Sequence, residues 1–250
     1  MRSFLGAITF YTIIPIPVTW ELDFQRIARW VPLIGLLIGG FLGLLDLGLE
    51  LLKVPNLTRS ALIVACWVAI TGGLHLDGAS DTADGLAVLD QQKRLEVMKD
   101  SVTGAFGVMA IVVLLLLKTA ALSDLHSYRW LGLMVVAGWA RWGQVVAIAV
   151  YPYLKPIGKG AFHKQAIRLP QDVLLGVLFL LAFSGLDLFL DIYTWQMSIL
   201  IAVIGSAISL LSGFWFQLQL GGHTGDTYGA VVEWTEAILL CLLSGIFPGV

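Results

Sequence analysis

Long apolar runs constrain the fold of this chain more than any other feature. A transmembrane helix needs about 20 mostly apolar residues, and seven segments reach or approach that length. Hydrophobic residues make up 58% of the 250 residues and charged residues only 13%, about half the share that is usual in a soluble domain. A soluble fold has too little interior for so much apolar surface. The predicted spans are 31–52, 59–74, 104–122, 130–151, 172–190, 196–216 and 236–250.

The sequence therefore predicts an all-α fold, a polytopic integral membrane helix bundle with about seven transmembrane helices. We expect one membrane domain over residues 1–250. The segment from about 4 to 30 is short and marked by Pro15 and Pro17 before it becomes charged, which favours an interfacial or re-entrant segment. The polar segments of about 75–103, 152–171 and 217–235 are predicted loops, and seven spans put them on the N-terminal side of the membrane.

The distribution of basic residues predicts which side that is. Most lysines and arginines outside the predicted spans lie in the N-terminal segment and the predicted loops, and the opposite side has only Lys53, Arg59 and Arg129. Cytoplasmic segments carry an excess of Lys and Arg. We therefore expect the N-terminus and the three loops to lie in the cytoplasm.

The segment 72–86, GGLHLDGASDTADGL, places Asp77, Asp81 and Asp84 among small residues. We expect this segment to be helical, and in a helix the three carboxylates lie within about 60° of one another around the axis. They repel one another where the dielectric constant is low, and the segment contains no Lys or Arg. A divalent cation such as Mg²⁺ relieves that repulsion and binds substrate phosphates. The alternative is a solvated acidic turn that caps a helix, but the clustering favours metal or phosphate chemistry.

Other polar residues are candidates for substrate contacts. The glycine-rich segment 220–230, LGGHTGDTYGA, offers backbone amides, Thr224 and Asp226, which suit phosphate oxygens, although a simple connection explains it equally well. Lys99 can hold a phosphate or belong to an ordinary charged helix face. Arg141 falls inside a predicted span, where a cation usually faces a partner or a cavity.

Five further polar residues are open to more than one interpretation. Lys118 lies toward the edge of a span, where it either snorkels to the interface or has a function. Glu233 and Glu236 either support the site or form a water-facing stripe. His75 and His223 lie near the candidate aspartates, but two histidines do not make a zinc site.

These motifs resemble a known family. The blocks GGLHLDGASDTADGL, MKDSVTGAFGV and GGHTGDTYGA resemble the signature blocks of cobalamin synthase, also called adenosylcobinamide-GDP ribazoletransferase. The opening FLGAITFYTIIPIPV and the later YLKPIGKGAF are similar to the family's start and to its loop after the fourth span. The resemblance covers most of the chain, with the blocks in the right order.

The resemblance implies a reaction and a setting. A hydroxyl of α-ribazole, or of its 5′-phosphate, attacks the cobinamide-proximal phosphate of adenosylcobinamide-GDP. GMP leaves, and the nucleotide loop of cobalamin is completed as adenosylcobalamin or its 5′-phosphate. The family is an Mg²⁺-dependent phosphotransferase of the bacterial inner membrane, which implies an active site facing the cytoplasm.

The residues themselves suit this chemistry and suggest expected roles and partners. Asp81 or Asp84 is the expected base. The expected metal ligands are Asp77, Asp81 and Asp84, and the expected substrate contacts are Lys99, Arg141, Thr224 and Asp226. The expected partners are the two substrates and the lipid bilayer, and no nucleic acid is expected. The sequence is compatible with a homo-oligomer.

Two other functions remain open from the residues alone. A membrane phosphotransferase of the CDP-alcohol type also gathers aspartates on helices, but its DGxxAR…GxxxD spacing is absent here. An ion or proton transporter should carry acidic residues near mid-membrane. The acidic cluster of this chain instead flanks the predicted spans on the predicted cytoplasmic side.

Overall fold

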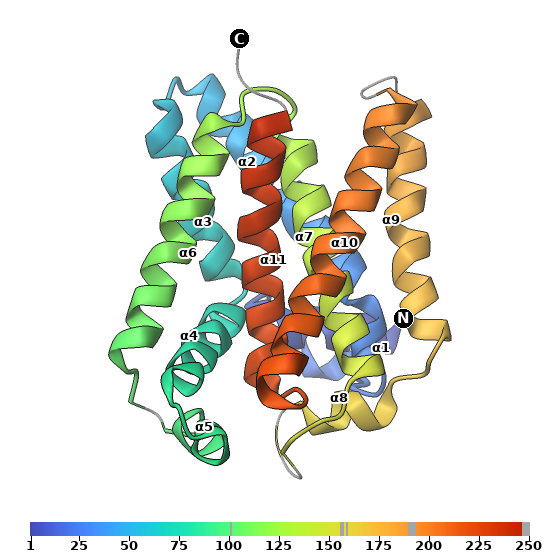
Figure 1. Ribbon diagram of the computed structural model, residues 1–250. Helices are drawn as coiled ribbons and strands as arrows, with labels where there is room; N and C mark the ends of the chain where they lie inside the picture. The colour runs from blue at the N-terminus through green and yellow to red at the C-terminus, as the bar shows by residue number, and fades with distance from the viewer. Residues whose placement is uncertain (101, 156–157, 159, 190–193, 247–250) are drawn as a thin grey trace.

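The computed structural model is a bundle of helices (Figure 1). It describes residues 1–100, 102–155, 158, 160–189 and 194–246, and these contain no β-strand apart from an isolated bridge between Tyr153 and His223. Two short 3-10 turns, Val18–Trp20 and Ile27–Trp30, follow the first helix. The helices are α1 (Arg2–Tyr11), α2 (Val31–Leu51), α3 (Asn56–Ile70), α4 (Leu74–Ala87), α5 (Gln91–Val97), α6 (Ala105–Asp124), α7 (Arg129–Val150), α8 (Ala161–Ala166), α9 (Gln171–Phe189), α10 (Trp195–Leu220) and α11 (Gly225–Ile246).

Five of these helical segments are long and apolar enough to cross a membrane: Ile27–Leu51, which includes α2, and α6, α7, α10 and α11. Helices α3 and α4 pass the same test only as a pair, and they are bent by 90° at the break between them. The bundle therefore has five or six candidate spans among the described residues. This confirms the all-α membrane fold, while the number of seven stays a prediction. We treat α4, which turns away at the bend, as lying outside the spans.

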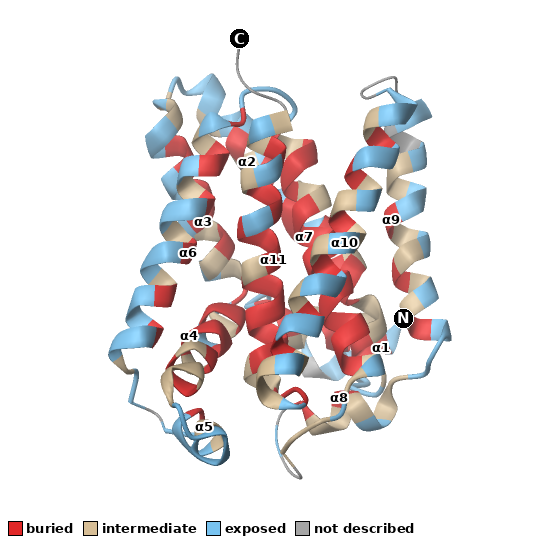
Figure 2. Ribbon diagram, in the orientation of Figure 1, coloured by how far each residue is buried: buried red, intermediate tan, exposed pale blue. Residues whose placement is uncertain are grey.

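Helices α7 and α11 form the centre of the bundle, and both are largely buried (Figure 2). Helices α6 and α10 are buried over much less of their length, and their exposed residues are mainly apolar, as lipid contact requires. The glycines at positions 35, 39 and 43 line the face of α2 that meets α7. A Cβ atom at Gly35 would lie 2.3 Å from the carbonyl oxygen of Ala137. Small residues at this spacing let two membrane helices approach closely.

The N-terminal segment and parts of all three polar segments lie at one end of the bundle. Figure 1 shows α1, α5, α8 and the turn between α10 and α11 at this end, with the α2–α3 connection at the other. The guanidinium of Arg94 in α5 donates to the carbonyl oxygen of Gln219 at 2.7 Å, and the amide of Leu154 donates to the carbonyl oxygen of His223 at 2.8 Å. The compartment that this end faces stays a prediction.

The predicted loop at 217–235 is wrong. Helix α10 continues to Leu220 and α11 begins at Gly225, so only a short turn separates them, and the predicted span at 236–250 begins too late. The charged residues Glu233 and Glu236 made this stretch look too polar for a membrane span, but both side chains are buried against other helices. The predicted loop at 75–103 contains α4, which agrees with the helix expected for the aspartate segment, and also α5. The segment at 4–30 begins inside α1.

Candidate active site

The segment that carries the aspartate cluster is helical, as predicted, and it crosses α11 at very short range. A Cβ atom at Gly78 would lie 2.6 Å from the carbonyl oxygen of Asp226. One at Gly229 would lie 2.8 Å from the carbonyl oxygen of His75. These two glycines let the backbones of α4 and α11 touch. The crossing therefore brings Asp77 on α4 and Asp226 on α11 to the same cavity.

Three carboxylates and one lysine gather at this crossing. Asp77 is exposed and Asp81, one turn further along α4, is half-buried. The ammonium of Lys155 donates to Asp226 Oδ2 at 2.7 Å. Burial raises the pKa of Asp81 to about 6, and the charges of Asp77 and Asp226 add to this rise while Lys155 opposes it. The three carboxyl groups are thus close enough that their mutual repulsion disfavours ionisation of all three. A bound cation would reduce this repulsion.

Asp84 has a different environment from the other two aspartates of α4. Its Oδ2 accepts a hydrogen bond from the amide of Gly104 at 2.7 Å, and its Oδ1 accepts one from the amide of Gly107 at 2.8 Å. These amides belong to the N-terminal turn of α6, where a carboxylate is favourable. A Cβ atom at Gly104 would lie 2.5 Å from the carboxylate. Both oxygens of Asp84 therefore bind the end of a neighbouring helix, and the predicted metal and catalytic roles of this residue have no support in its contacts.

A small polar cavity lies beside the carboxylates, between the chain segments of α1, α4, α7, α8 and α11. Its volume is about 100 Å³. Asp77 and Asp226 line it, and so do buried side chains that the sequence did not single out. These are Tyr11, Gln144, His163 and Tyr228. Several polar atoms of this lining have no hydrogen-bond partner among the described residues.

The two histidines near the aspartates differ sharply. Both ring nitrogens of buried His75 lack a partner in the described part of the chain, and the ring lines the cavity. His223 is fully buried but uses both nitrogens, with Nδ1 at 3.1 Å from Thr227 Oγ1 and Nε2 at 3.1 Å from the carbonyl oxygen of Gly213. Its pKa is lowered to about 4, mainly by burial. His223 therefore ties the α10–α11 turn together, whereas His75 is available to a ligand.

Thr224 and Asp226 shape the start of α11. The amide of Thr227 donates to Thr224 Oγ1 at 3.3 Å, and this hydroxyl donates to Asp226 Oδ2 at 3.2 Å. Thr224 is fully buried, so it acts as a helix cap. Asp226 reaches the cavity and Thr224 does not.

Arg141 and Lys118 belong to a buried ionic network inside the bundle. Lys118 Nζ lies 2.5 Å from carboxylate oxygens of Glu233 and of Glu236, and Arg141 donates to Glu236 Oε1 at 2.7 Å. All four side chains are almost completely buried. Snorkelling of Lys118 and a water-facing stripe of glutamates are therefore wrong. Because Arg141 is paired within the bundle, the structure does not bring it to the cavity.

Lys99 also lies apart from the cavity. It follows α5 in an exposed turn. The described residues include no group of three His, Cys, Asp or Glu side chains that is arranged to hold a metal ion. The metal set predicted from the aspartate stripe therefore stays a prediction, with Asp84 turned toward α6.

The sequence did not single out Lys155 or the polar lining of the cavity. Lys155 lies inside the motif YLKPIGKGAF and Tyr228 inside GGHTGDTYGA. Their place in these motifs could have identified both as candidate site residues. Tyr11 lies inside the opening block FLGAITFYTIIPIPV and His163 directly follows YLKPIGKGAF, whereas Gln144 lies in an apolar run. No sequence pattern marked these three residues as neighbours.

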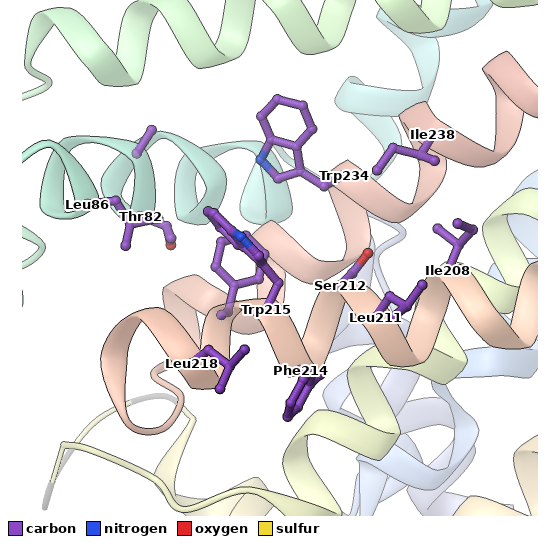
Figure 3. A pocket seen from close by; sticks show the side chains of 12 residues that line it. Thr82, Leu86, Ile208, Leu211, Ser212, Phe214, Trp215, Leu218, Trp234 and Ile238 are labelled. Atoms are coloured by element: carbon purple, nitrogen blue, oxygen red, sulfur yellow. The ribbon is translucent and has the colours of Figure 1, made fainter.

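A second, wider hollow contains none of this chemistry. Figure 3 shows an apolar groove of about 660 Å³ between α4, α10 and α11, lined by side chains such as Leu86, Trp215 and Trp234. None of its lining residues is titratable. The polar chemistry therefore concentrates at the cavity of His75, Asp77 and Asp226.

Fold and site together define a polytopic membrane protein whose polar site lies at one end of its helix bundle. The chain belongs to the cobalamin-5-phosphate synthase family, whose model matches residues 3–244. It is 58% identical over 244 residues to the adenosylcobinamide-GDP ribazoletransferase of Trichormus variabilis, covering 98% of this chain and 97% of the relative. A Synechocystis protein of the same name is 51% identical over 245 residues, with 96% and 93% covered. No solved structure gives a significant match.

Proposed function

We propose that this chain is an adenosylcobinamide-GDP ribazoletransferase. It transfers the adenosylcobinamide phosphate group of adenosylcobinamide-GDP to α-ribazole or its 5′-phosphate. The acceptor hydroxyl oxygen forms the new bond to phosphorus, the bond from phosphorus to the GMP oxygen breaks, and the hydroxyl loses its proton. The products are GMP and adenosylcobalamin or its 5′-phosphate. The proposal is supported by the family match over nearly the whole chain and by the names of its close relatives.

The observation that carries the mechanism is the meeting of α4 and α11 at one cavity. Phosphoryl transfer depends mainly on positioning and on neutralising charge. Lys155, paired with Asp226 at 2.7 Å, offers the diphosphate a cation at the mouth of the cavity. The charges of Asp77 and Asp226 both act on the carboxyl group of Asp81. Since both oxygens of Asp84 bind backbone amides, Asp81 is the carboxylate that accepts the hydroxyl proton.

The proposed cofactor is Mg²⁺, held by Asp77, Asp81 and Asp226 together with the diphosphate. In the described structure these three carboxylates are not gathered around one point, so the diphosphate would have to supply the remaining oxygen ligands. The chemistry of the donors fits, because the carboxylates repel one another and hard cations prefer their oxygens. When bound, the ion would offset charge on the phosphates and on the leaving GMP. This proposal uses Asp226 in place of Asp84, because both oxygens of Asp84 accept hydrogen bonds from backbone amides.

The proposed location is the bacterial inner membrane, with the site facing the cytoplasm. The candidate spans support a multi-pass membrane protein. The excess of basic residues at the end that carries the site supports its orientation.

A direct assay tests the function. Protein purified in detergent is incubated with adenosylcobinamide-GDP, α-ribazole and Mg²⁺, and the products are separated by chromatography. We expect GMP and adenosylcobalamin in equal amounts, and neither product after the divalent cation is chelated. Full turnover with chelator would overturn the metal proposal alone. Absence of both products with every component present would overturn the transferase.

A further inference from the structure

The inner part of the cavity is polar but carries no free positive charge. His75, Gln144, Tyr228 and His163 are each at most 4% exposed. Both nitrogens of His75, Gln144 Oε1 and the Tyr228 hydroxyl lack partners among the described residues. Unpaired buried polar atoms are rare and destabilising, so this cluster indicates a place where another molecule supplies the hydrogen bonds.

The charged groups around the cavity lie at its mouth or are paired elsewhere. Asp77 is exposed and Asp226 partly exposed, in contrast to the buried polar side chains of the same lining, so these two mark the mouth, with Lys155 bound to Asp226. Behind His75, Arg141 and Lys118 are neutralised by buried glutamates. Burial lowers the pKa of His163 to about 3, so this ring is neutral at physiological pH. The outer part therefore suits phosphate and metal, and the inner part suits an uncharged group rich in hydroxyls.

We infer that the inner cavity binds the ribose of the nucleoside acceptor, with His75, Gln144 and Tyr228 hydrogen-bonded to the sugar hydroxyls. This inference rests on the proposed function. The sugar then reaches the mouth with its attacking hydroxyl toward the carboxylate cluster of Asp77, Asp81 and Asp226.

Size and polarity favour the sugar over the other parts of the substrates. A volume of about 100 Å³ holds roughly three water molecules or one five-membered sugar ring. A phosphate would lack a cation there, and an apolar base would leave the polar atoms of His75, Gln144 and Tyr228 unpaired, which is unfavourable. Ribose hydroxyls donate and accept, so they satisfy all three side chains.

The variant Tyr228→Phe tests the inference because it removes only the hydroxyl. That hydroxyl has no protein partner in the described structure, so we expect the melting temperature to stay the same or rise slightly. We expect the dissociation constant for α-ribazole, measured by calorimetry without the donor, to rise about three- to tenfold. In the full reaction the KM for α-ribazole should rise by the same factor, while the KM for adenosylcobinamide-GDP should not change.

Two comparisons make the experiment specific. Gln144→Leu should act in the same direction as Tyr228→Phe. Tyr128 is an exposed tyrosine directly before α7, in the connection from α6 that lies at the opposite end of the bundle (Figure 1). Tyr128→Phe should leave both constants unchanged. A 2′,3′-dideoxy analogue of α-ribazole should bind wild-type protein weakly and lose less affinity than α-ribazole in the Tyr228→Phe variant.

The outcomes separate the two proposals. An inactive wild-type protein that still binds α-ribazole through Tyr228 would overturn the transferase and keep the sugar site. An active wild-type protein whose affinity for α-ribazole is the same in Tyr228→Phe and Gln144→Leu would overturn the sugar site and keep the transferase. A rise in the KM for adenosylcobinamide-GDP alone would also overturn the sugar site.

Discussion

Asp77, Asp81 and Asp84 occupy successive turns of one helix, and their different neighbours give them different chemistry. Asp77 is exposed at the cavity, Asp81 is half-buried between other carboxylates, and Asp84 binds the amides of α6. Helical periodicity cannot distinguish the three residues, because it describes one helix and not the helices that pack against it.

For Asp81→Asn we expect loss of transfer in a folded protein. The substitution keeps the size of the side chain and removes the charge that the site needs. Activity should fall at least about a hundredfold, which corresponds to roughly 3 kcal/mol of transition-state stabilisation. Because Asp77 and Asp226 repel the Asp81 carboxylate, the melting temperature should not fall. Activity and melting temperature are both measured on protein purified in detergent. Near-wild-type turnover would remove Asp81 from the active site.

For Asp84→Asn we expect the reverse pattern, a loss of stability. The amide group of Asn would face the backbone N–H of either Gly104 or Gly107, which donate to the carboxylate in the native protein. Loss of this helix cap costs about 1–2 kcal/mol. Asp77→Asn is the matched control, since Asp77 is exposed and its replacement should leave the melting temperature unchanged while lowering activity. Equal melting temperatures for the two variants would contradict the capping role of Asp84.

At the scale of the elements, the crossing of α4 and α11 creates the site. The sequence predicted the helix of the aspartate cluster correctly but interpreted the start of α11 as a loop. That error has a physical cause, because Thr227, Glu233 and Glu236 are polar and yet buried. The partners of the glutamates, Lys118 and Arg141, lie far away in the sequence. Local polarity therefore could not show whether these side chains face water or each other.

The crossing itself can be tested with Gly78→Ala. The added methyl group would lie 2.6 Å from the carbonyl oxygen of Asp226, so α4 and α11 must move apart. Such overpacking costs about 1–3 kcal/mol, and transfer activity should fall because Asp77 and Asp226 separate. Gly48→Ala in α2 is the matched control, since nothing lies within 4 Å of its added Cβ and alanine favours a helix. Similar stability and activity in the two variants would show that the crossing tolerates a side chain.

At the scale of the whole molecule, the polar segments and the N-terminal helix share one end of the bundle (Figure 1). The sequence predicted this, because loops after alternate spans must lie on the same side. It could not predict the cavity, since Tyr11, Gln144 and His163 come from three separate helices and no motif contains more than one of them. The number of spans is also difficult to predict, because α3 and α4 form one bent pair.

The orientation of the bundle gives the last prediction. Leu89, which lies between α4 and α5, is 95% exposed, and Leu52, at the opposite end, is 75% exposed. In a chain whose two native cysteines, Cys66 and Cys241, are replaced by alanine, we introduce Leu89→Cys or Leu52→Cys. The excess of lysine and arginine at the α5 end predicts a cytoplasmic location for Leu89. A membrane-impermeant maleimide should label position 52 in intact spheroplasts, and position 89 only in inverted vesicles. Labelling of position 89 from outside would reverse the orientation and would place the carboxylates of α4 away from cytoplasmic nucleotide substrates.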